Sequence, residues 1–271
     1  MANKKLLLVR KMSALEYYYN GNHPSPIIRG SHENHNKYVA QIRDILQKAG
    51  KDFDIVTRRE LSEEFVGRYD AVISAGGDGT VIAVAAKNKE TPQLNLRTDE
   101  RSVGALCQKD IPNALDSLLS GEYKIENWTR IDIIFEGKFL GRALNHVYIA
   151  ELLEGDQFAK YELEWVSNDG IIHKVTHGNS GLVIATGTGS TGWKAEFKGY
   201  PRDSRDIVFS GLSNIPETKH GCGNYFKVKY LGHEGKFRLD SDKAVRYTFP
   251  RDSVLEVKIS DYPLKVILPN P

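Results

Sequence analysis

The sequence contains very little cysteine: Cys107 and Cys222 are the only two, and no Cys-X-X-Cys spacing occurs. This excludes a disulfide framework and a cysteine-based zinc site, and it suits a reducing compartment. Apolar runs long enough to span a membrane are also missing. Residues 6–9 have the composition of a strand and follow Met1–Lys5 directly, so we expect no signal or transit peptide. We therefore expect a cytoplasmic protein without a membrane partner.

An excess of charge of one sign is missing as well. The 37 Lys and Arg residues nearly balance the 35 Asp and Glu residues, giving a net charge of +2. A balance of this kind argues against bulk nucleic-acid binding, although a local basic pocket can still exist. The length of 271 residues and a hydrophobic content of 40% suit a globular chain with one large domain or two modest ones.

The clearest local pattern is a strand, a glycine turn and a helix start. Residues 71–75 are small or apolar, Gly76-Gly77-Asp78-Gly79-Thr80 follow at once, and a helical pattern begins at Thr80. Such a turn suits phosphate, because glycine lets the backbone approach closely and a helix N-terminus favours an anion. A carboxylate would repel that phosphate. Asp78 is therefore either a helix cap or a group that does chemistry beside the phosphate.

The first half of the chain alternates strand-like runs with helical patterns, at residues 6–9, 38–46, 53–56, 61–66 and 71–75. This order predicts a parallel sheet covered by helices, a Rossmann-like unit. Residues 13–36 are polar and are expected to be irregular. Arg10 and Lys11 follow the first strand at its carboxyl end, where open α/β sheets bind ligands, so they are candidates for phosphate contact or else an exposed charged loop.

The second half shows almost no helical periodicity and predicts an antiparallel β domain. Hairpin signals occur at 136–138 and at 169–170 between strand-like runs. Another apolar run, Leu182–Ala185, leads into Thr186–Trp193, a loop of glycines and hydroxyls. Hydroxyls can hold phosphate or ribose oxygens, and Trp193 offers a flat face to a base. One such loop is weak support, but one in each domain favours a nucleotide held between the domains.

These motifs resemble those of a known family. Gly76–Thr80 is similar to the signature of NAD kinases, of diacylglycerol and sphingosine kinases and, less fully, of phosphofructokinases. The stretch from Ser180 to Trp193 resembles the second NAD kinase motif, which the lipid kinases lack, and Leu144–Val147 stands at the position of the family's Asn-Glu pair. Further agreement with the mitochondrial-type branch is found at Val9–Lys11, Arg58–Glu60, Thr98, Asp99, Arg101, Ser102, Gly104 and Trp193.

The resemblance implies an α/β plus all-β fold, with a Rossmann-like N-terminal domain and a C-terminal antiparallel β-sandwich. We expect the first domain over residues 1–108, with 261–271 as a candidate to complete it, and a β-rich NAD-binding domain over residues 109–260. The resemblance also implies a homodimer or a homotetramer.

The implied activity is transfer of the γ-phosphoryl group of ATP, with Mg²⁺ or another divalent cation, to the adenosine ribose 2′-hydroxyl of NAD. Asp78 would be the general base, and Gly76, Gly77 and Gly79 would cradle phosphate. The other expected contacts to the nucleotides are Thr80, Arg10, Lys11, Asn145, His146, Thr188, Thr191, Gly192 and Trp193. No residue is assigned as a protein ligand of the metal.

Three departures from the family pattern affect the substrate. His146 replaces an acidic residue, and an imidazole accepts fewer hydrogen bonds from ribose hydroxyls than a carboxylate does. Ser180 stands where many members carry Asp, and residues 194–223 lack the proline-rich continuation of the family. Two alternatives therefore stay open: a dinucleotide-binding or regulatory protein without catalysis, and a kinase of the same superfamily with another, lipid-type acceptor.

Overall fold

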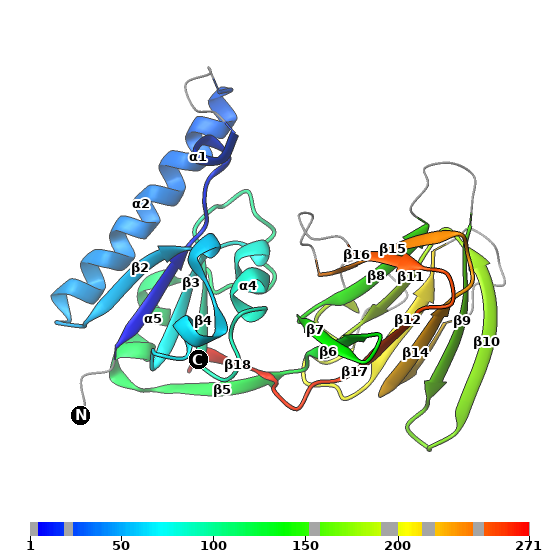
Figure 1. Ribbon diagram of the computed structural model, residues 1–271. Helices are drawn as coiled ribbons and strands as arrows, with labels where there is room; N and C mark the ends of the chain where they lie inside the picture. Colours follow the sequence, from blue (N-terminus) through cyan, green and yellow to red (C-terminus); the bar gives the residue numbers. More distant parts are fainter. Residues whose placement is uncertain are drawn as a thin grey trace. The chain divides into compact units, whose positions relative to one another are not determined.

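The computed structural model describes residues 5–18, 24–151, 158–190, 200–212, 220–240 and 247–270. The chain divides into two compact units (Figure 1). Unit 1 comprises Met1–Glu126 together with Leu264–Pro271, and unit 2 comprises Asn127–Pro263. Strands make up most of the described regular secondary structure, and the described helices of eight or more residues all belong to unit 1.

Unit 1 contains a six-stranded sheet in the order β2-β1-β3-β4-β18-β5. Its strands are β1 (Leu6–Arg10), β2 (Phe53–Thr57), β3 (Ala71–Gly76), β4 (Gln93–Arg97), β5 (Tyr123–Trp128) and β18 (Leu264–Pro269). The pairs β1–β2, β1–β3, β3–β4 and β4–β18 are parallel, as the alternation of strands and helices predicts. In parallel strands the carboxyl ends meet at one edge, so the ends of β1 and β3 lie side by side, with Arg10 opposite Ala75.

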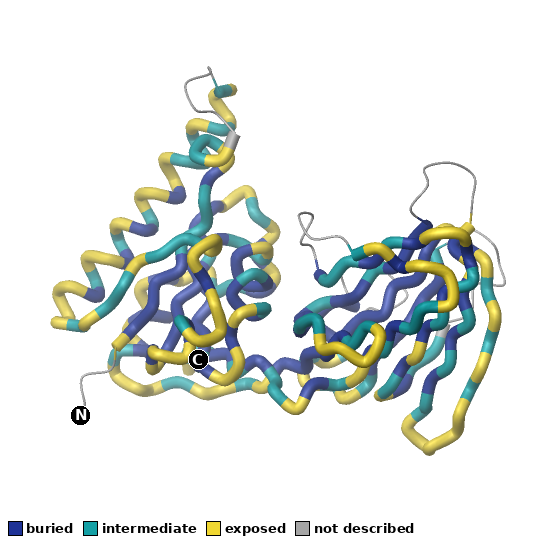
Figure 2. Tube along the Cα trace, viewed as in Figure 1, coloured by how far each residue is buried: buried dark blue, intermediate teal, exposed yellow. Residues whose placement is uncertain are grey.

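Helices cover both faces of this sheet. They are α1 (Ala14–Tyr18), α2 (Pro26–Lys48), the 3₁₀ turn η1 (Arg58–Glu60), α3 (Glu63–Val66), α4 (Asp78–Ala85) and α5 (Ile111–Ser120). Leu6 and Leu8 of β1 pack in a cluster with α2 and α5. Leu7 and Val9 point the other way and pack with α3 and α4. Figure 2 shows β1, β3 and β4 buried, whereas the outer side of α2 is exposed.

Helix α2 corrects the prediction that residues 13–36 are irregular. It starts at Pro26, whose ring fixes a helical φ and whose missing N–H needs no partner in the first turn. His35 of α2 is buried at a position where an apolar residue would be expected, and it is hydrogen-bonded to Thr98 inside unit 1. A polar stretch therefore forms a helix that hydropathy alone does not reveal.

The boundary between the units differs from the expected one after residue 108. Helix α5 packs against β4 and β18, with Ile111, Ala114 and Leu115 in the same apolar cluster as β1 and β3. The chain leaves unit 1 only at Glu126, and Leu264–Pro271 returns to it through β18, which pairs with β4. Residues 109–126 thus belong to the parallel-sheet unit.

Unit 2 contains two six-stranded sheets, ordered β10-β9-β14-β17-β6-β7 and β13-β12-β11-β8-β15-β16. Their strands are β6 (Ile131–Phe135), β7 (Lys138–Ala143), β8 (His146–Glu151), β9 (Ala159–Val166), β10 (Ile172–Asn179), β11 (Leu182–Ala185), β12 (Ile207–Gly211), β13 (His220–Gly223), β14 (Tyr225–Tyr230), β15 (Glu234–Leu239), β16 (Tyr247–Pro250) and β17 (Val254–Ile259). All of the strand pairs described in unit 2 are antiparallel. One apolar cluster joins the two sheets, with Leu163 and Phe226 from the first and Ile149 and Phe237 from the second.

Both predicted hairpins are confirmed. Strands β6 and β7 pair across Glu136 and Gly137, which have φ values of 48° and 73°, as a tight right-twisting turn requires. Strands β9 and β10 pair around Gly170 at a φ of 81°. Among the described helices, none is both long enough and apolar enough to cross a membrane.

Candidate functional site

The glycine turn joins β3 to α4 and has no space for side chains at its first two positions. A Cβ at Gly76 would lie 2.1 Å from Oγ1 of Thr80, and one at Gly77 would lie 2.2 Å from Oγ of Ser102. A Cβ at Gly79 would meet nothing within 4 Å. The Thr80 side chain is buried and packs against the backbone of the turn at Gly76. The turn therefore packs tightly on its inner side and is open at Gly79.

Asp78 is not the N-cap of α4. That position belongs to Gly77, and no side chain caps the helix. The Asp78 carboxylate instead accepts a hydrogen bond from the N–H of Leu106 at 2.9 Å and another from the N–H of Ala105 at 3.2 Å. These contacts fix the carboxylate at the first turn of the helix by means of a loop that is distant in sequence. A fixed carboxylate at this point is what a general base needs.

Arg10 and Lys11 lie at the carboxyl end of β1, as predicted, but each is paired with a carboxylate. The Arg10 guanidinium donates to Glu16 at 2.8 Å, and Nζ of Lys11 donates to Oδ2 of Asp99 at 2.9 Å. The side chains of Arg10 and Lys11 remain 27% and 20% exposed, so both are partly accessible to a ligand. A phosphate bound here would compete with Glu16 and Asp99 for these two cations.

Asp99 organises the loop that holds Asp78, a role that sequence reasoning missed. Its carboxylate accepts hydrogen bonds from Ser31, Lys11 and the backbone N–H of Arg101. Burial by itself would raise the pKa of Asp99, but the hydrogen bonds from Ser31 and Lys11 lower it well below its ordinary value. Asp99 thus stays ionised and ties α2 and the end of β1 to the loop. Asp99 is one of the residues that resemble the mitochondrial-type branch, and that agreement was the one sign in the sequence that Asp99 belongs to the site.

His35 lies beneath the same loop and is kept neutral. Nε2 donates to the Lys11 carbonyl at 3.1 Å, so Nδ1 is free to accept from the Thr98 hydroxyl at 2.7 Å. Burial, together with the charge of Lys11, lowers the pKa of His35 from 6.5 to about 4. Its ring nitrogens are used in these hydrogen bonds. His32, another histidine of α2, is hydrogen-bonded to Ser13 and Asn36.

The lowered pKa of His35 predicts acid sensitivity. Between pH 6.5 and about pH 5 the unfolded chain gains a proton at His35 while the folded chain does not, so acid favours unfolding. We expect this group to remove on the order of 1–2 kcal/mol from the free energy of unfolding over that range. The pKa of Asp240 is raised to about 6, so protonation of this carboxyl on acidification favours the folded state and opposes the effect of His35.

Urea unfolding of wild type and of His35→Gln at pH 7 and at pH 5 isolates the contribution of the histidine. Wild type should lose more stability than the variant on acidification, because the variant has no imidazole to protonate. Equal losses in the two proteins would show that His35 is not held neutral by the fold.

The second cluster of predicted residues lies in unit 2, around the turn before β8. Asp240 is buried and accepts three backbone hydrogen bonds, from Leu144 at 3.0 Å, Asn145 at 2.7 Å and His146 at 3.0 Å. Burial raises the pKa of Asp240 to about 6, although the three N–H donors oppose the rise. One carboxylate thus fixes the backbone of the Asn145-His146 pair. Sequence reasoning did not assign Asp240 to the site.

The glycine-hydroxyl loop packs directly on this turn. Thr186 donates its hydroxyl to the Leu144 carbonyl at 2.6 Å and its N–H to the Asn145 carbonyl at 2.9 Å. Thr188 is buried within the same loop. Oδ1 of Asn145 is buried and has no hydrogen-bond partner within the described part of the chain. A buried acceptor of this kind is costly unless a ligand or water satisfies it, so Asn145 stays a candidate binding residue.

Gly189 makes the closest approach between the loop and the turn. A Cβ there would lie 2.0 Å from the Asn145 carbonyl oxygen, which is backbone and cannot move aside as a side-chain tip can. We expect Gly189→Ala to displace the loop and to lower the free energy of unfolding by about 1–3 kcal/mol. Gly30→Ala in α2 is the matched control, because a Cβ there meets nothing within 4 Å. Thermal unfolding should show a clear loss for the first variant and no loss for the second.

His146 is buried at 3% exposure, on the strand face opposite the core residues Val147 and Ile149. Burial, together with the charge of Arg238, lowers its pKa to about 4, so the imidazole is neutral near pH 7. Thr191, Gly192 and Trp193 lie outside the described residues. The predicted site residues that are described thus form one group in each unit: the glycine turn with Arg10 and Lys11, and Asn145-His146 with the second loop.

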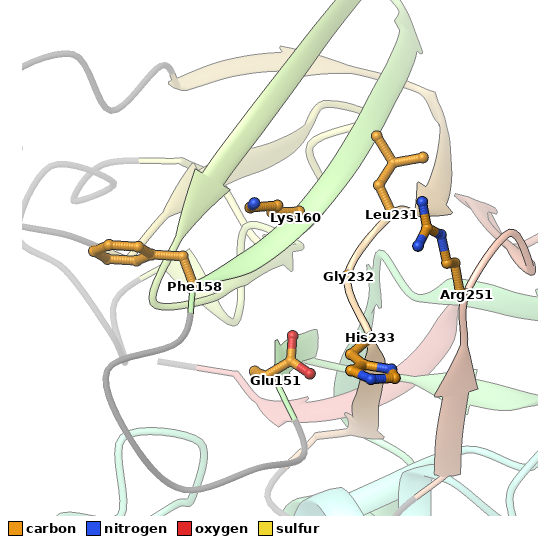
Figure 3. Close-up of a pocket in the computed structure, with 7 residues that line it drawn as sticks. All are labelled: Glu151, Phe158, Lys160, Leu231, Gly232, His233 and Arg251. Carbon is orange, nitrogen blue, oxygen red and sulfur yellow. The ribbon is translucent and has the colours of Figure 1, made fainter.

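A cavity of about 520 Å³ occurs elsewhere in unit 2 (Figure 3). Glu151, Phe158, Lys160, His233 and Arg251 contribute to its lining, and none of the predicted site residues does. Within the described residues, no three His, Cys, Asp or Glu side chains are grouped so that they could hold a metal ion.

The fold is that of nucleotide kinases acting on NAD or NADH. The chain superimposes on an NAD kinase from Archaeoglobus fulgidus in complex with ATP with a TM-score of 0.70, at 17% identity, over 98% of this chain and 94% of that one. It superimposes on yeast NADH kinase complexed with NADH with a TM-score of 0.74, at 13% identity, over 100% of this chain and 85% of that one.

Sequence relatives agree with the fold. The chain is 32% identical to human "NAD kinase 2, mitochondrial" over 60% of this chain and 46% of that protein. It is 27% identical to "Probable NADH kinase" of Oryza sativa subsp. japonica, over 87% of this chain and 82% of that protein. No protein-family profile matches the chain. The predicted resemblance to NAD kinases, mitochondrial-type ones included, is confirmed. The chain spans only about half the length of the mitochondrial relatives, for example 46% of the human protein.

Proposed function

We propose that the protein transfers the γ-phosphoryl group of ATP to the adenosine ribose 2′-hydroxyl of NAD and so makes NADP. The observation that carries this proposal is the fixed Asp78 carboxylate. It lies within the glycine turn at the start of α4, in a fold shared with NAD and NADH kinases. The fold neighbour bound to ATP supports the choice of donor, and the relatives named as NAD kinases support the choice of acceptor.

In the proposed reaction Asp78 orients the 2′-hydroxyl and accepts its proton. The ribose oxygen forms a bond to the γ-phosphorus, the bond from that phosphorus to the bridging oxygen of ATP breaks, and ADP leaves with the electron pair. Gly76, Gly77 and Gly79 contact phosphate through backbone. Arg10 and Lys11 exchange their carboxylate partners for phosphate oxygens, and Asn145 uses its buried Oδ1 to bind a donor group of the nucleotide.

Mg²⁺ fits this site without a protein cage. Magnesium is commonly held by substrate phosphates and one or two carboxylates, and Asp78 is the carboxylate on the glycine turn that could hold it. When bound, Mg²⁺ would neutralise charge on the transferred phosphoryl group. Arg10 and Lys11 would share that role from the end of β1.

We further propose that the two units are a Rossmann-like domain and a β-sandwich domain. The parallel strands with helices on both faces support the first, and the apolar cluster shared by two antiparallel sheets supports the second. We also propose a cytoplasmic homodimer or homotetramer, on the grounds of cysteine usage and the resemblance to NAD kinases. Sedimentation velocity tests the assembly.

His146 favours a second candidate function, that of a dinucleotide-binding protein without catalysis. A neutral, buried imidazole with only one acceptor nitrogen replaces a carboxylate of the family, which would weaken contacts to ribose hydroxyls. His146→Glu tests this point directly. An unchanged KM for NAD in that variant would show that the replacement has no effect on the acceptor site.

The experiment that separates the candidates incubates the purified protein with ATP, Mg²⁺ and NAD and measures NADP. Parallel reactions replace ATP by polyphosphate, NAD by NADH, and NAD by diacylglycerol. NADP formed from ATP and NAD supports the proposal. NAD binding in calorimetry without NADP formation supports the binding protein, and a phosphorylated lipid supports the lipid-type kinase.

A further inference from the structure

The described residues that line the cavity of unit 2 include more positive than negative side chains. Lys160 lies near the start of β9. His233 lies in the turn between β14 and β15, and Arg251 lies in the turn between β16 and β17. Figure 3 shows these side chains and that of Glu151 around the Gly232 backbone. Three separate chain segments thus bring two cations and an imidazole to one cavity of about 520 Å³.

Among the described residues that line the cavity, Glu151 is the one carboxylate, and other protein groups already donate hydrogen bonds to it. Glu151 is only 7% exposed. It accepts one hydrogen bond from the Tyr230 hydroxyl and one from the Glu234 N–H. Burial, followed by the bond to Glu151, raises the pKa of Tyr230 well above its ordinary value, so the hydroxyl keeps its proton and donates it. Gly232 is required beside them, since a Cβ there would lie 2.8 Å from Oε2 of Glu151.

The cations of the cavity have little compensation. Within the described residues Lys160 forms no ion pair, and the Arg251 guanidinium approaches a carboxylate oxygen of Asp252 only to 4.0 Å. Asp252 is itself 3.0 Å from Nζ of Lys229, so its charge is shared. An exposed Arg, an exposed Lys and a His around one cavity form a donor set that suits phosphate oxygens.

We propose that this cavity binds a phosphate-bearing small molecule of about mononucleotide size. Lys160, Arg251 and His233 hold the phosphate group, and the free lone pairs of Glu151 accept from a hydroxyl or amino group of the same ligand. Phe158, which also lines the cavity and is 47% exposed, adds an aromatic ring to the lining. A volume of about 520 Å³ lies in the usual range of small-molecule sites.

The cavity is separate from the site of the proposed kinase reaction. His146 begins β8 and Glu151 ends it, so the two residues are roughly 16 Å apart along an extended strand. The described residues that line this cavity all belong to unit 2, and binding there does not depend on kinase activity. The test is therefore a binding measurement without ATP or NAD.

The experiment follows the imidazole resonance of His233 by NMR, assigned from its loss in His233→Gln, while inorganic phosphate, AMP or adenosine is added. The pocket variant is the double substitution Lys160→Gln and Arg251→Gln. The matched control is Lys138→Gln with Arg205→Gln, which removes the same charges from exposed positions of unit 2 outside the cavity. This local readout separates the cavity from any second nucleotide site.

We expect AMP and phosphate, but not adenosine, to shift the His233 resonance, with AMP the tighter of the two. The pocket variant should bind AMP at least about tenfold more weakly, because two charge-assisted hydrogen bonds are lost, and the control should bind as wild type does. The proposal is overturned by the absence of a shift with AMP, by an equal response to adenosine, or by equal affinities in the pocket and control variants.

Discussion

Asn in place of Asp78 is expected to lower kcat by about 10²–10⁴ while the protein stays folded. The amide cannot accept the proton of the ribose hydroxyl, although it keeps nearly the same shape and one acceptor oxygen. Ala105 and Leu106 each donate a backbone N–H to the carboxylate, and one of these bonds survives in the variant. The loss of activity should therefore exceed any loss of stability, and thermal unfolding and steady-state kinetics on the same preparation measure both.

Asp110→Asn is the control for a merely structural carboxylate in the same unit. Asp110 is the true N-cap of α5 and accepts from the Asn113 N–H at 3.1 Å. Its replacement by Asn, another good N-cap residue, should leave kcat unchanged. If Asp78→Asn behaved like Asp110→Asn, the carboxylate would have no part in the chemistry and would serve only to hold the 105–106 loop.

The second large effect is expected at Asp240. Substitution by Ala leaves the N–H groups of Leu144, Asn145 and His146 without their acceptor in a buried place. We expect a loss of about 3 kcal/mol in the free energy of unfolding, since each buried donor left unpaired costs on the order of 1–3 kcal/mol and relief of a buried charge offsets part of the sum. Urea unfolding measures the loss.

Asp240→Asn is the matched variant at this position. Asn tolerates the φ of 50° that Asp240 adopts, and it retains one acceptor oxygen, so its loss of stability should be smaller. If the proposed function holds, both variants should raise the KM for NAD, because the Asn145 backbone is no longer fixed. Wild-type stability in Asp240→Ala would contradict the role of Asp240 as the support of this turn.

The local patterns of the sequence predicted local structure well. The glycine turn after β3 and the hairpins at Glu136-Gly137 and Gly170 depend on residues adjacent in sequence. Gly137 and Gly170 have φ values of 73° and 81°, which glycine adopts without strain. The resemblance to NAD kinases, carried by the same short motifs, was predicted from the sequence and is confirmed by relatives and fold.

The contacts that build the site were not predictable in the same way. Asp240 reaches the Asn145 turn from β15, and the partners of Asp78 come from a loop beyond β4. Neither pairing leaves a periodic or local signal, because both depend on how distant segments fold together. The N-terminal part of α2 was not predicted for a related reason. Its buried residue His35 is polar and is stabilised by hydrogen bonds to Thr98 and Lys11, so the apolar periodicity of a helix is missing there.

The most direct test of the central claim follows the label from ATP carrying a labelled γ-phosphate, in the presence of Mg²⁺ and NAD. The proposed reaction predicts label in NADP, on the 2′-oxygen of the adenosine ribose, in an amount equal to the ADP formed. Asp78→Asn should reduce that transfer to a small fraction of the wild-type rate. Label found only in ATP and inorganic phosphate, with NAD bound but unchanged, would contradict the assignment of the protein as an NAD kinase.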